Sequence, residues 1–347
     1  MALDVKVKID MAKTYGSLGF GYPLILIENA EAAITYKVYS DITTIATDYA
    51  STTDAYKVAQ LMFAQPHRPE KIAICSDTGT VTEWLAKDAN ISKDWRQLVV
   101  LNGSSSKTAT TTAAIAAAIE ALSVEKMFFA NESMPTSLSS ATAPSGASGW
   151  DRTVMFYYTP IQASTGSGNT PAVEAVPLPV AALVGEIAGL TPGSYTVNNL
   201  VLNGIEPLEL SQDDIDKIHS IGGITFVSAA GDNVCSEGKT ASGEFIDNVD
   251  NNDYIKQQLE YKTQKVLNGS LKVPYTNAGI ALLEAAAISV MKDAQNKGIV
   301  ESYTVTYALR EQTSAEDRAA RKYFGGNVQY SMQGAIHTVE IYCQATV

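Results

Sequence analysis

The chain has 347 residues, of which 46% are hydrophobic and 18% are charged, enough material for two or three compact units with apolar cores. Its net charge of −12 argues against a nucleic-acid-binding protein, because such proteins need a basic surface to neutralise phosphates. Three widely spaced cysteines, Cys75, Cys235 and Cys343, form no Cys-x-x-Cys pair, which argues against a zinc site or a thioredoxin-like motif.

The first residues alternate between apolar and charged side chains, a pattern that predicts a half-buried strand over residues 3–11. Leu3, Val5, Val7 and Ile9 would share its apolar face. The N-terminus shows no basic region followed by an apolar run, and no stretch reaches the ~20 apolar residues of a membrane span. We therefore expect a protein that is made and folded in the cytoplasm, without membrane insertion.

Residues 24–158 alternate between strand and helix patterns. Strands are predicted at 24–27, 71–75, 97–101, 126–130 and 154–158, and helices at 41–46, 53–63, 80–87 and 111–122. Strands separated by helices are typical of parallel βαβ units. Two stretches rich in Ser, Thr, Ala, Pro and Gly, at 133–148 and 163–171, predict surface loops.

The second half of the chain predicts longer helices. They are expected at 180–187, after the capping residue Ser211, at 253–267 and at 277–296, with strands at 224–228 and 303–309 and a charged helix at 315–324. The chain ends on a second alternating pattern, which predicts a strand over 339–347. Val339, Ile341, Cys343 and Ala345 would share one of its faces.

Both ends of the chain therefore predict strands with an apolar face, and such a strand needs a sheet to join. Each backbone hydrogen bond nets only ~0.5–1.5 kcal/mol, so the apolar face must be covered as well. The pattern leaves open whether that sheet belongs to the same chain or to a neighbouring copy.

Two segments of the second half resemble the contractile phage tail sheath family. One runs from LTPGSY at Leu190 through NGIEPLELSQDDIDKIHSIGGITFVSAAGDN, and the other is the ending GIVESYTVTYALREQTSAEDRAARKYFGGNVQYSMQGAIHTVEIYCQATV. The earlier piece FAQPHRPEKIAI, at 63–74, is similar to segments of related phage tail proteins. The order of these motifs, and no single one of them, carries the resemblance.

The resemblance implies an α/β (α+β) fold with a mixed-sheet sheath core domain near the tail tube, an outward inserted α/β domain, and extended N- and C-terminal β-strand arms. The N-terminal arm and the strand after it would span 1–28, the outer domain 29–175, the core domain 176–334 and the C-terminal arm 335–347. The apolar faces of the two arms would pair with neighbouring subunits.

The resemblance also implies a structural protein with no enzymatic activity and no cofactor. Sheath subunits form six-fold rings, stacked as a helix around the tail tube protein, and meet baseplate and tail terminator proteins. They contract to drive the tube through a bacterial envelope. The chain would then lie in the virion tail of a phage, a prophage or a phage-tail-like bacteriocin. The alternatives are another tail or baseplate component of sheath-like fold, or a flavodoxin-like nucleotide-binding enzyme.

Candidate small-molecule sites are weak. The loop CSDTGT at 75–80 follows a strand and precedes a helix, but it lacks the glycine spacing of phosphate-binding motifs. Asp247, Asp250 and Asp253 lack the order of an EF-hand, so we expect a loop that leads to a helix cap. The histidines are far apart in sequence and fit no catalytic triad: His67, His219 and His337.

Four basic residues close in sequence form the best candidate patch in an acidic chain: Arg310, Arg318, Arg321 and Lys322. They predict either the solvated face of a helix or a weak, salt-sensitive contact to the tail tube that can be released during contraction.

Overall fold

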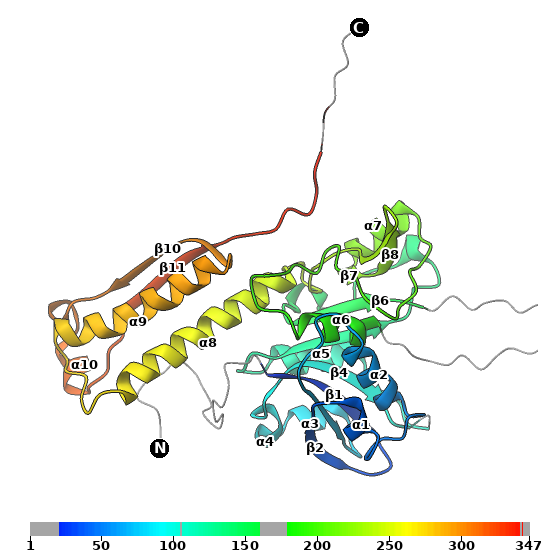
Figure 1. Ribbon diagram of the computed structural model, residues 1–347, viewed down its shortest axis with the longest axis horizontal. Helices are drawn as coiled ribbons and strands as arrows, with labels where there is room; N and C mark the ends of the chain where they lie inside the picture. The colour runs from blue at the N-terminus through cyan, green and yellow to red at the C-terminus, as the bar shows by residue number, and fades with distance from the viewer. Residues whose placement is uncertain (1–20, 105, 160–178, 341, 343–347) are drawn as a thin grey trace, which may run out of the picture. The chain divides into compact units, whose positions relative to one another are not determined.

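The computed structural model describes residues 21–104, 106–159, 179–340 and 342, which are coloured in Figure 1. They fall into two compact units. The sheet unit holds the described residues of 21–191 together with 199–249, and the hairpin unit holds 192–198 and the described residues from 250 onward. The strand predicted at 3–11 and the loop predicted at 163–171 lie outside the described residues.

A seven-stranded sheet forms the centre of the sheet unit, in the order β2-β3-β1-β4-β5-β6-β7. The strands are β1 (Tyr22–Glu28), β2 (Ile34–Tyr39), β3 (Ile72–Ser76), β4 (Trp95–Asn102), β5 (Met127–Glu132), β6 (Thr153–Tyr157) and β7 (Gly223–Ile224). Every neighbouring pair is parallel except β2 and β3. The predicted parallel βαβ units are thereby confirmed, and the antiparallel edge strand β2, which was not predicted, makes the sheet mixed.

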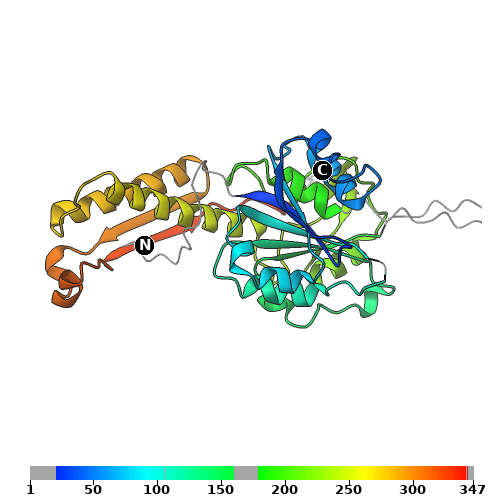
Figure 2. The ribbon, with the colours of Figure 1, turned by 90° about the horizontal axis from the view of Figure 1, so that it is seen from below.

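Helices cover both faces of this sheet (Figure 2), which is why its inner strands are continuous apolar runs. Leu24 and Leu26 of β1 pack with α3 (Val81–Leu85) and α5 (Thr112–Glu120) on one face. On the other face, α2 (Asp54–Phe63) and α6 (Pro179–Ile187) pack against each other. The unit also contains α1 (Ile42–Ile45), α4 (Asp88–Ile91) and α7 (Gln212–Ser220).

Capping residues fix where several of these helices begin. Thr53, Thr80, Thr111 and Ser211 each accept a hydrogen bond from the backbone N–H three residues further on. Thr80 and Glu83 complete a capping box. The predicted helix starts at these positions are confirmed.

The strand predicted at 224–228 is wrong as a single element, because Thr225 interrupts it. β7 completes the large sheet, whereas β8 (Phe226–Ala229) leaves it and pairs with β9 (Asp232–Cys235). The N–H of Thr225 donates to the hydroxyl of Ser236 at 3.1 Å. A side chain thus takes the bond that would otherwise hold this residue in a strand ladder.

Two long helices and a two-stranded sheet make up most of the hairpin unit. The helices are α8 (Ile246–Asn268), which belongs to this unit from residue 250, and α9 (Asn277–Asn296); the strands are β10 (Val300–Tyr307) and β11 (Gly326–Met332). α9 lies along the hairpin, as Figure 1 shows. Tyr303, Val305 and Tyr307 are the partly buried residues of β10 and alternate with exposed polar ones. None of the described helices is long and apolar enough to cross a lipid bilayer.

The loop predicted around Asp247, Asp250 and Asp253 is wrong, because these residues form the first turns of α8. Ile246 and Val249 are both buried at helical spacing and anchor the additional turns. A carboxylate in the first turn is also favoured by the helix dipole, which is positive at this end.

The charged helix predicted at 315–324 is shorter than expected, since α10 (Ala315–Ala319) ends in a Schellman motif. The N–H of Lys322 donates to the carbonyl of Asp317 at 2.9 Å, and the N–H of Arg321 donates to the carbonyl of Arg318 at 3.2 Å. Arg321 has a φ of 56°, the left-handed conformation that ends the helix and turns the chain toward β11.

Residues 333–340 and 342 follow β11 without regular secondary structure. The strand predicted at 339–347 extends past the described residues and stays a prediction. The predicted domain boundaries after residues 28, 175 and 334 separate parts with different roles in an assembly, and they also stay a prediction. Within the chain, the sheet unit draws on both sides of residue 175, because β7 joins the sheet.

Candidate assembly surfaces

The carboxyl edge of the parallel strands is where ligands bind in open α/β sheets, at the point where chain connections diverge to either side. That point lies at the carboxyl end of β1, which has β3 on one side and β4 on the other. Glu28, the last residue of β1, fills it with its carboxylate, and the residue is 1% exposed. The carboxylate accepts hydrogen bonds from the N–H of Val81 at 2.9 Å, from the N–H of Thr110 at 2.7 Å and from the Thr110 hydroxyl. A phosphate there would meet a negative charge already bound to the amides it needs.

Further polar contacts close the same crevice. The side-chain amide of Asn29 donates to the side chain of Asn102 at 3.1 Å and to the carbonyl of Thr108 at 3.2 Å. Lys107 donates to the carbonyl of Thr78, inside the CSDTGT loop, at 3.2 Å. The loop singled out for nucleotide binding is therefore tied to its neighbours, and the crevice does not favour the nucleotide-binding alternative.

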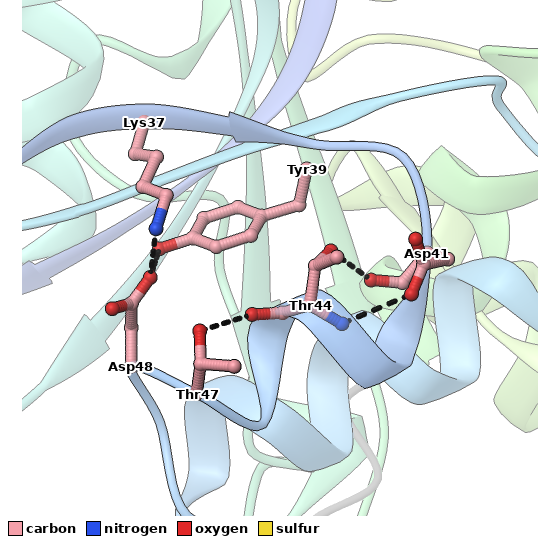
Figure 3. A network of polar contacts seen from close by, with 6 residues as sticks. All are labelled: Lys37, Tyr39, Asp41, Thr44, Thr47 and Asp48. Atoms are coloured by element: carbon pink, nitrogen blue, oxygen red, sulfur yellow. Dashed lines mark hydrogen bonds and ion pairs between the residues drawn. The ribbon is translucent and has the colours of Figure 1, made fainter.

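The edge strand β2 is fastened to the segment around α1 by the network in Figure 3. Lys37 and Tyr39 both bind the carboxylate of Asp48, the tyrosine hydroxyl at 2.8 Å. The hydrogen bonds from these two side chains hold the pKa of Asp48 below its ordinary value. Asp41 caps α1 by accepting the N–H of Thr44 at 2.9 Å. A paired lysine on an edge strand discourages the addition of another strand.

The hairpin has edges of a different kind. Among the described strands, β10 and β11 pair with each other and with no other strand, so each keeps one edge able to accept an added strand. The exposed face of the hairpin is polar and uncharged along three cross-strand pairs: Ser302 with Ser331, Thr304 with Gln329, and Thr306 with Asn327.

The C-terminal segment (residues 333–340 and 342) carries large apolar side chains in solvent. Ile336, Val339 and Tyr342 are 84%, 70% and 90% exposed. Val339 is one of the predicted arm residues. The others lie outside the described residues: Leu3, Val5, Val7, Ile9, Ile341, Cys343 and Ala345.

The root of this segment is fixed to the hairpin unit at two points. The N–H of Gln333 donates to the carbonyl of Ile299 at 3.0 Å, and Nε2 of His337 lies 2.9 Å from the hydroxyl of Thr196. The described residues beyond His337 are exposed, with Tyr342 bonded only locally to Glu340.

The four predicted basic residues all lie in the link between β10 and β11, and the structure separates them into two kinds. The guanidinium of Arg318 donates to the carbonyl of Arg310 at 3.1 Å and to the carbonyl of Thr313, so it organises the link itself. Arg310, Arg321 and Lys322 are exposed.

Sequence reasoning missed two apolar residues beside these cations. Leu309 and Phe324 are 50% and 68% exposed. Leu309 directly follows Ala308 and Phe324 directly precedes Gly325, and the N–H of Ala308 donates to the carbonyl of Gly325 at 2.9 Å, so each lies one residue beyond this cross-strand hydrogen bond. The sequence did hold a signal for an exposed aromatic residue, namely Tyr323 and Phe324 directly before Gly325 and Gly326. The helix predicted at 315–324 included both aromatic residues, so the signal was missed. The name tip is used below for five exposed residues: Leu309, Arg310, Arg321, Lys322 and Phe324.

The histidines have separate partners and form no common site. Nδ1 of His67 lies 2.5 Å from the carboxylate of Glu186, and Nε2 of His219 lies 2.9 Å from the hydroxyl of Ser236. Burial lowers the pKa of His219. In the part of the chain that the structure describes, no group of three or more His, Cys, Asp or Glu side chains could hold a metal ion.

No family model and no curated protein matches the sequence. Solved structures match over nearly the whole chain. The helical sheath of the anti-feeding prophage in its contracted state aligns with a TM-score of 0.67 and 13% identity, over 94% of this chain and 93% of that one. The sheath of PVC, an extracellular contractile injection system, in its contracted state aligns with a TM-score of 0.67 and 10% identity, over 95% of this chain and 92% of that one.

The crystal structure of a sheath tail protein from Desulfitobacterium hafniense aligns with a TM-score of 0.55 and 10% identity, over 85% of this chain and 92% of that one. At these identities the likeness is one of fold. The chain has the fold of contractile sheath proteins, and the predicted fold class is confirmed at this level.

Proposed function

We propose that this chain is a sheath subunit of a contractile tail or injection apparatus. It polymerises around a tail tube and contracts to drive the tube through a bacterial envelope. The observation that carries the proposal is a fold shared over 94% of the chain with a sheath in its contracted state. The role is structural, with neither an enzymatic reaction nor a cofactor, and the energy of contraction is stored during assembly.

Added strands link neighbouring copies in this proposal. The hairpin offers two open edges, and the C-terminal segment offers exposed apolar side chains such as Ile336 and Val339. An added strand gains about 0.5–1.5 kcal/mol for each backbone hydrogen bond and about 1.5–3 kcal/mol for each large apolar side chain that becomes buried. We assign the arms at 3–11 and 335–347 to these edges.

The same proposal assigns the remaining roles. Copies form six-fold rings stacked as a helix, with residues 29–175 outward and 176–334 toward the tube. The other partners are the tail tube protein and the baseplate and tail terminator proteins, and the chain lies in the virion tail after assembly in the bacterial cytoplasm. Arg310, Arg318, Arg321 and Lys322 belong to the end of the core domain that we place against the tube.

Negative-stain electron microscopy of the purified full-length chain tests this function. Hollow striated tubes are the expected result. A uniform population of small particles would contradict a sheath and favour a baseplate component of the same fold.

Deletion of residues 336–347 should abolish these tubes and leave the monomer folded. A finer test replaces Ile336 and Val339 with serine, and its matched control carries Thr338→Ser and Glu340→Gln in the same segment. Tubes should be lost in the first variant and kept in the second. Normal polymerisation of the truncated chain would show that the arm assignment is wrong.

A further inference from the structure

One tripeptide, Leu-Asn-Gly, occurs three times in the chain, at residues 101–103, 202–204 and 267–269. In an Asn-Gly pair the amide carbon of the side chain can reach the next backbone nitrogen, and glycine leaves that nitrogen unhindered because it has no Cβ. Attack by this nitrogen expels ammonia and closes a succinimide ring. Since the local sequence is the same at all three places, a difference in reactivity must come from the fold.

The copy at 101–103 is held against this reaction. The N–H of Gly103, whose nitrogen would have to attack, donates to the carbonyl of Glu28 at 2.8 Å. The side chain of Asn102 donates to the carbonyl of Ser104 at 2.8 Å and accepts from the side chain of Asn29 at 3.1 Å. These hydrogen bonds must break before the side chain can turn toward the glycine nitrogen.

The copy at 267–269 is held in a similar way by the end of α8. Asn268 is the last residue of this helix, and its side-chain oxygen accepts from the side-chain amide of Gln264 at 2.8 Å. The N–H of Gly269 donates to the carbonyl of Lys265 at 2.9 Å, which continues the helical pattern of hydrogen bonds. Both reacting groups are therefore engaged here as well.

The copy at 202–204 leaves both reacting groups open. Asn203 and Gly204 are exposed, and no residue that the structure describes binds the side chain of Asn203 or accepts from the N–H of Gly204. Gln65 holds only the backbone of Asn203, because its side chain accepts from the N–H at 2.9 Å and donates to the carbonyl at 2.9 Å. Gly204 has a φ of 78°, which favours glycine over residues whose side chains would hinder the attack.

We propose that Asn203 is a site of spontaneous deamidation in the folded chain, whereas Asn102 and Asn268 are protected. The nitrogen of Gly204 forms a bond to Cγ of Asn203 as it gives up its proton, and the side-chain nitrogen leaves as ammonia. Water then opens the succinimide at one of its two carbonyls and leaves a carboxylate, without oxidation or reduction. The reaction belongs to the chain itself, so it is independent of the proposed function.

The two products differ in their effect on Gln65, which is 3% exposed and also binds the end of α2 through the carbonyl of Leu61 at 3.0 Å. Opening at the side-chain carbonyl gives aspartate with an ordinary backbone. Opening at the backbone carbonyl gives isoaspartate, in which the chain runs through Cβ and Cγ and the carbonyl bound by Gln65 becomes a free carboxylate. Because the link between α2 and residue 203 is then altered, isoaspartate should lower the stability of the sheet unit.

Prolonged incubation of the full-length chain at mildly alkaline pH, followed by digestion and mass spectrometry, measures aspartate and isoaspartate at the three sites. In the folded chain Asn203 should react about ten- to a hundredfold faster than Asn102 or Asn268, because two or more hydrogen bonds must break at each protected site. In concentrated urea the three rates should agree within about threefold, because unfolding removes the protecting bonds.

Asn203→Ser is the matched control, since Gln65 binds only backbone groups at this position and serine cannot deamidate. Incubated wild type should unfold at a lower urea concentration than incubated Asn203→Ser. Freshly prepared Asn203→Asp, which carries the new charge on an ordinary backbone, should unfold close to fresh wild type.

Two results in the folded chain overturn the proposal. One is a faster reaction at Asn102 or Asn268 than at Asn203, and the other is an intact Asn203 after the sample in urea has reacted. An equal loss of stability in incubated Asn203→Ser would show that deamidation at this position does not weaken the sheet unit.

Discussion

Replacement of Glu28 by alanine should destabilise the sheet unit by about 3 kcal/mol. The substitution leaves the N–H groups of Val81 and Thr110 without their acceptor, and an unpaired buried donor costs about 1–3 kcal/mol. Relief of the cost of burying a carboxylate offsets part of the sum. For a unit of this size the change corresponds to a melting temperature about 6–12 °C lower.

Tryptophan fluorescence during urea unfolding is the appropriate measurement, because the three tryptophans of the chain, Trp84, Trp95 and Trp150, all lie in the sheet unit. The urea stability of Glu28→Gln should fall between those of Glu28→Ala and wild type, since the amide oxygen still accepts from one N–H group while the amide NH2 faces the other. Glu31→Gln, in the exposed turn after β1, makes the same charge change and should stay within about 0.5 kcal/mol of wild type.

A Glu28→Ala protein that unfolds at the wild-type urea concentration would refute this reasoning. The crevice would then be held closed by something other than the carboxylate, and the electrostatic argument against a phosphate ligand would lose its basis.

Three further predictions concern single positions. Ala230 has a φ of 54° in the two-residue turn between β8 and β9, so Ala230→Asn should raise the urea stability of the sheet unit by about 0.5–1 kcal/mol. Burial raises the pKa of the Cys75 thiol to about 12 and that of Cys235 as well, so neither should react with a thiol reagent at pH 8 until the chain is unfolded. Partial burial works to raise the pKa of Asp293, but the hydrogen bond and charge of Lys297 outweigh it and hold the pKa below its ordinary value. Lys297→Met should raise that pKa in a carboxyl NMR titration. It should also remove stability that the wild type has above about pH 4 and loses as the pH falls through the folded value.

The sheet could be predicted from the sequence because its strands and helices carry strong local signals. Inner strands covered on both faces appear as continuous apolar runs, and threonine or serine caps mark the helix starts. β2 was missed although Ile34, Tyr36 and Val38 alternate with the polar Thr35 and Lys37, so the strand signal was present in the sequence. The start of α8 was missed because a run of Asp and Asn reads as a loop, whereas burial of Ile246 and Val249 stabilises a helix there.

The candidate surfaces were predictable only in part. Alternation of side chains identified the C-terminal segment, and its described apolar residues are in solvent. The internal role of Arg318 depends on carbonyls brought near by the fold, which sequence spacing does not reveal. Phe324 was counted as a helix residue, and its exposure follows from the Schellman motif that ends α10 early. A carboxylate at the end of an apolar strand was a usable signal for Glu28.

In the proposed function, the two units divide stability and assembly between them. In the sheet unit, Glu28 closes the crevice at the carboxyl edge of the strands, and Lys37 is paired with Asp48 on the edge strand β2. These polar contacts serve the stability of the subunit itself. The hairpin unit holds the open strand edges, the exposed C-terminal segment and the tip. Substitutions should therefore separate cleanly: Glu28→Ala shifts unfolding but still allows tubes at temperatures where the subunit is folded. Val339→Ser with Ile336→Ser leaves unfolding unchanged and removes the tubes. If both kinds of variant lost stability and assembly together, the surfaces that bind neighbours would extend into the sheet unit.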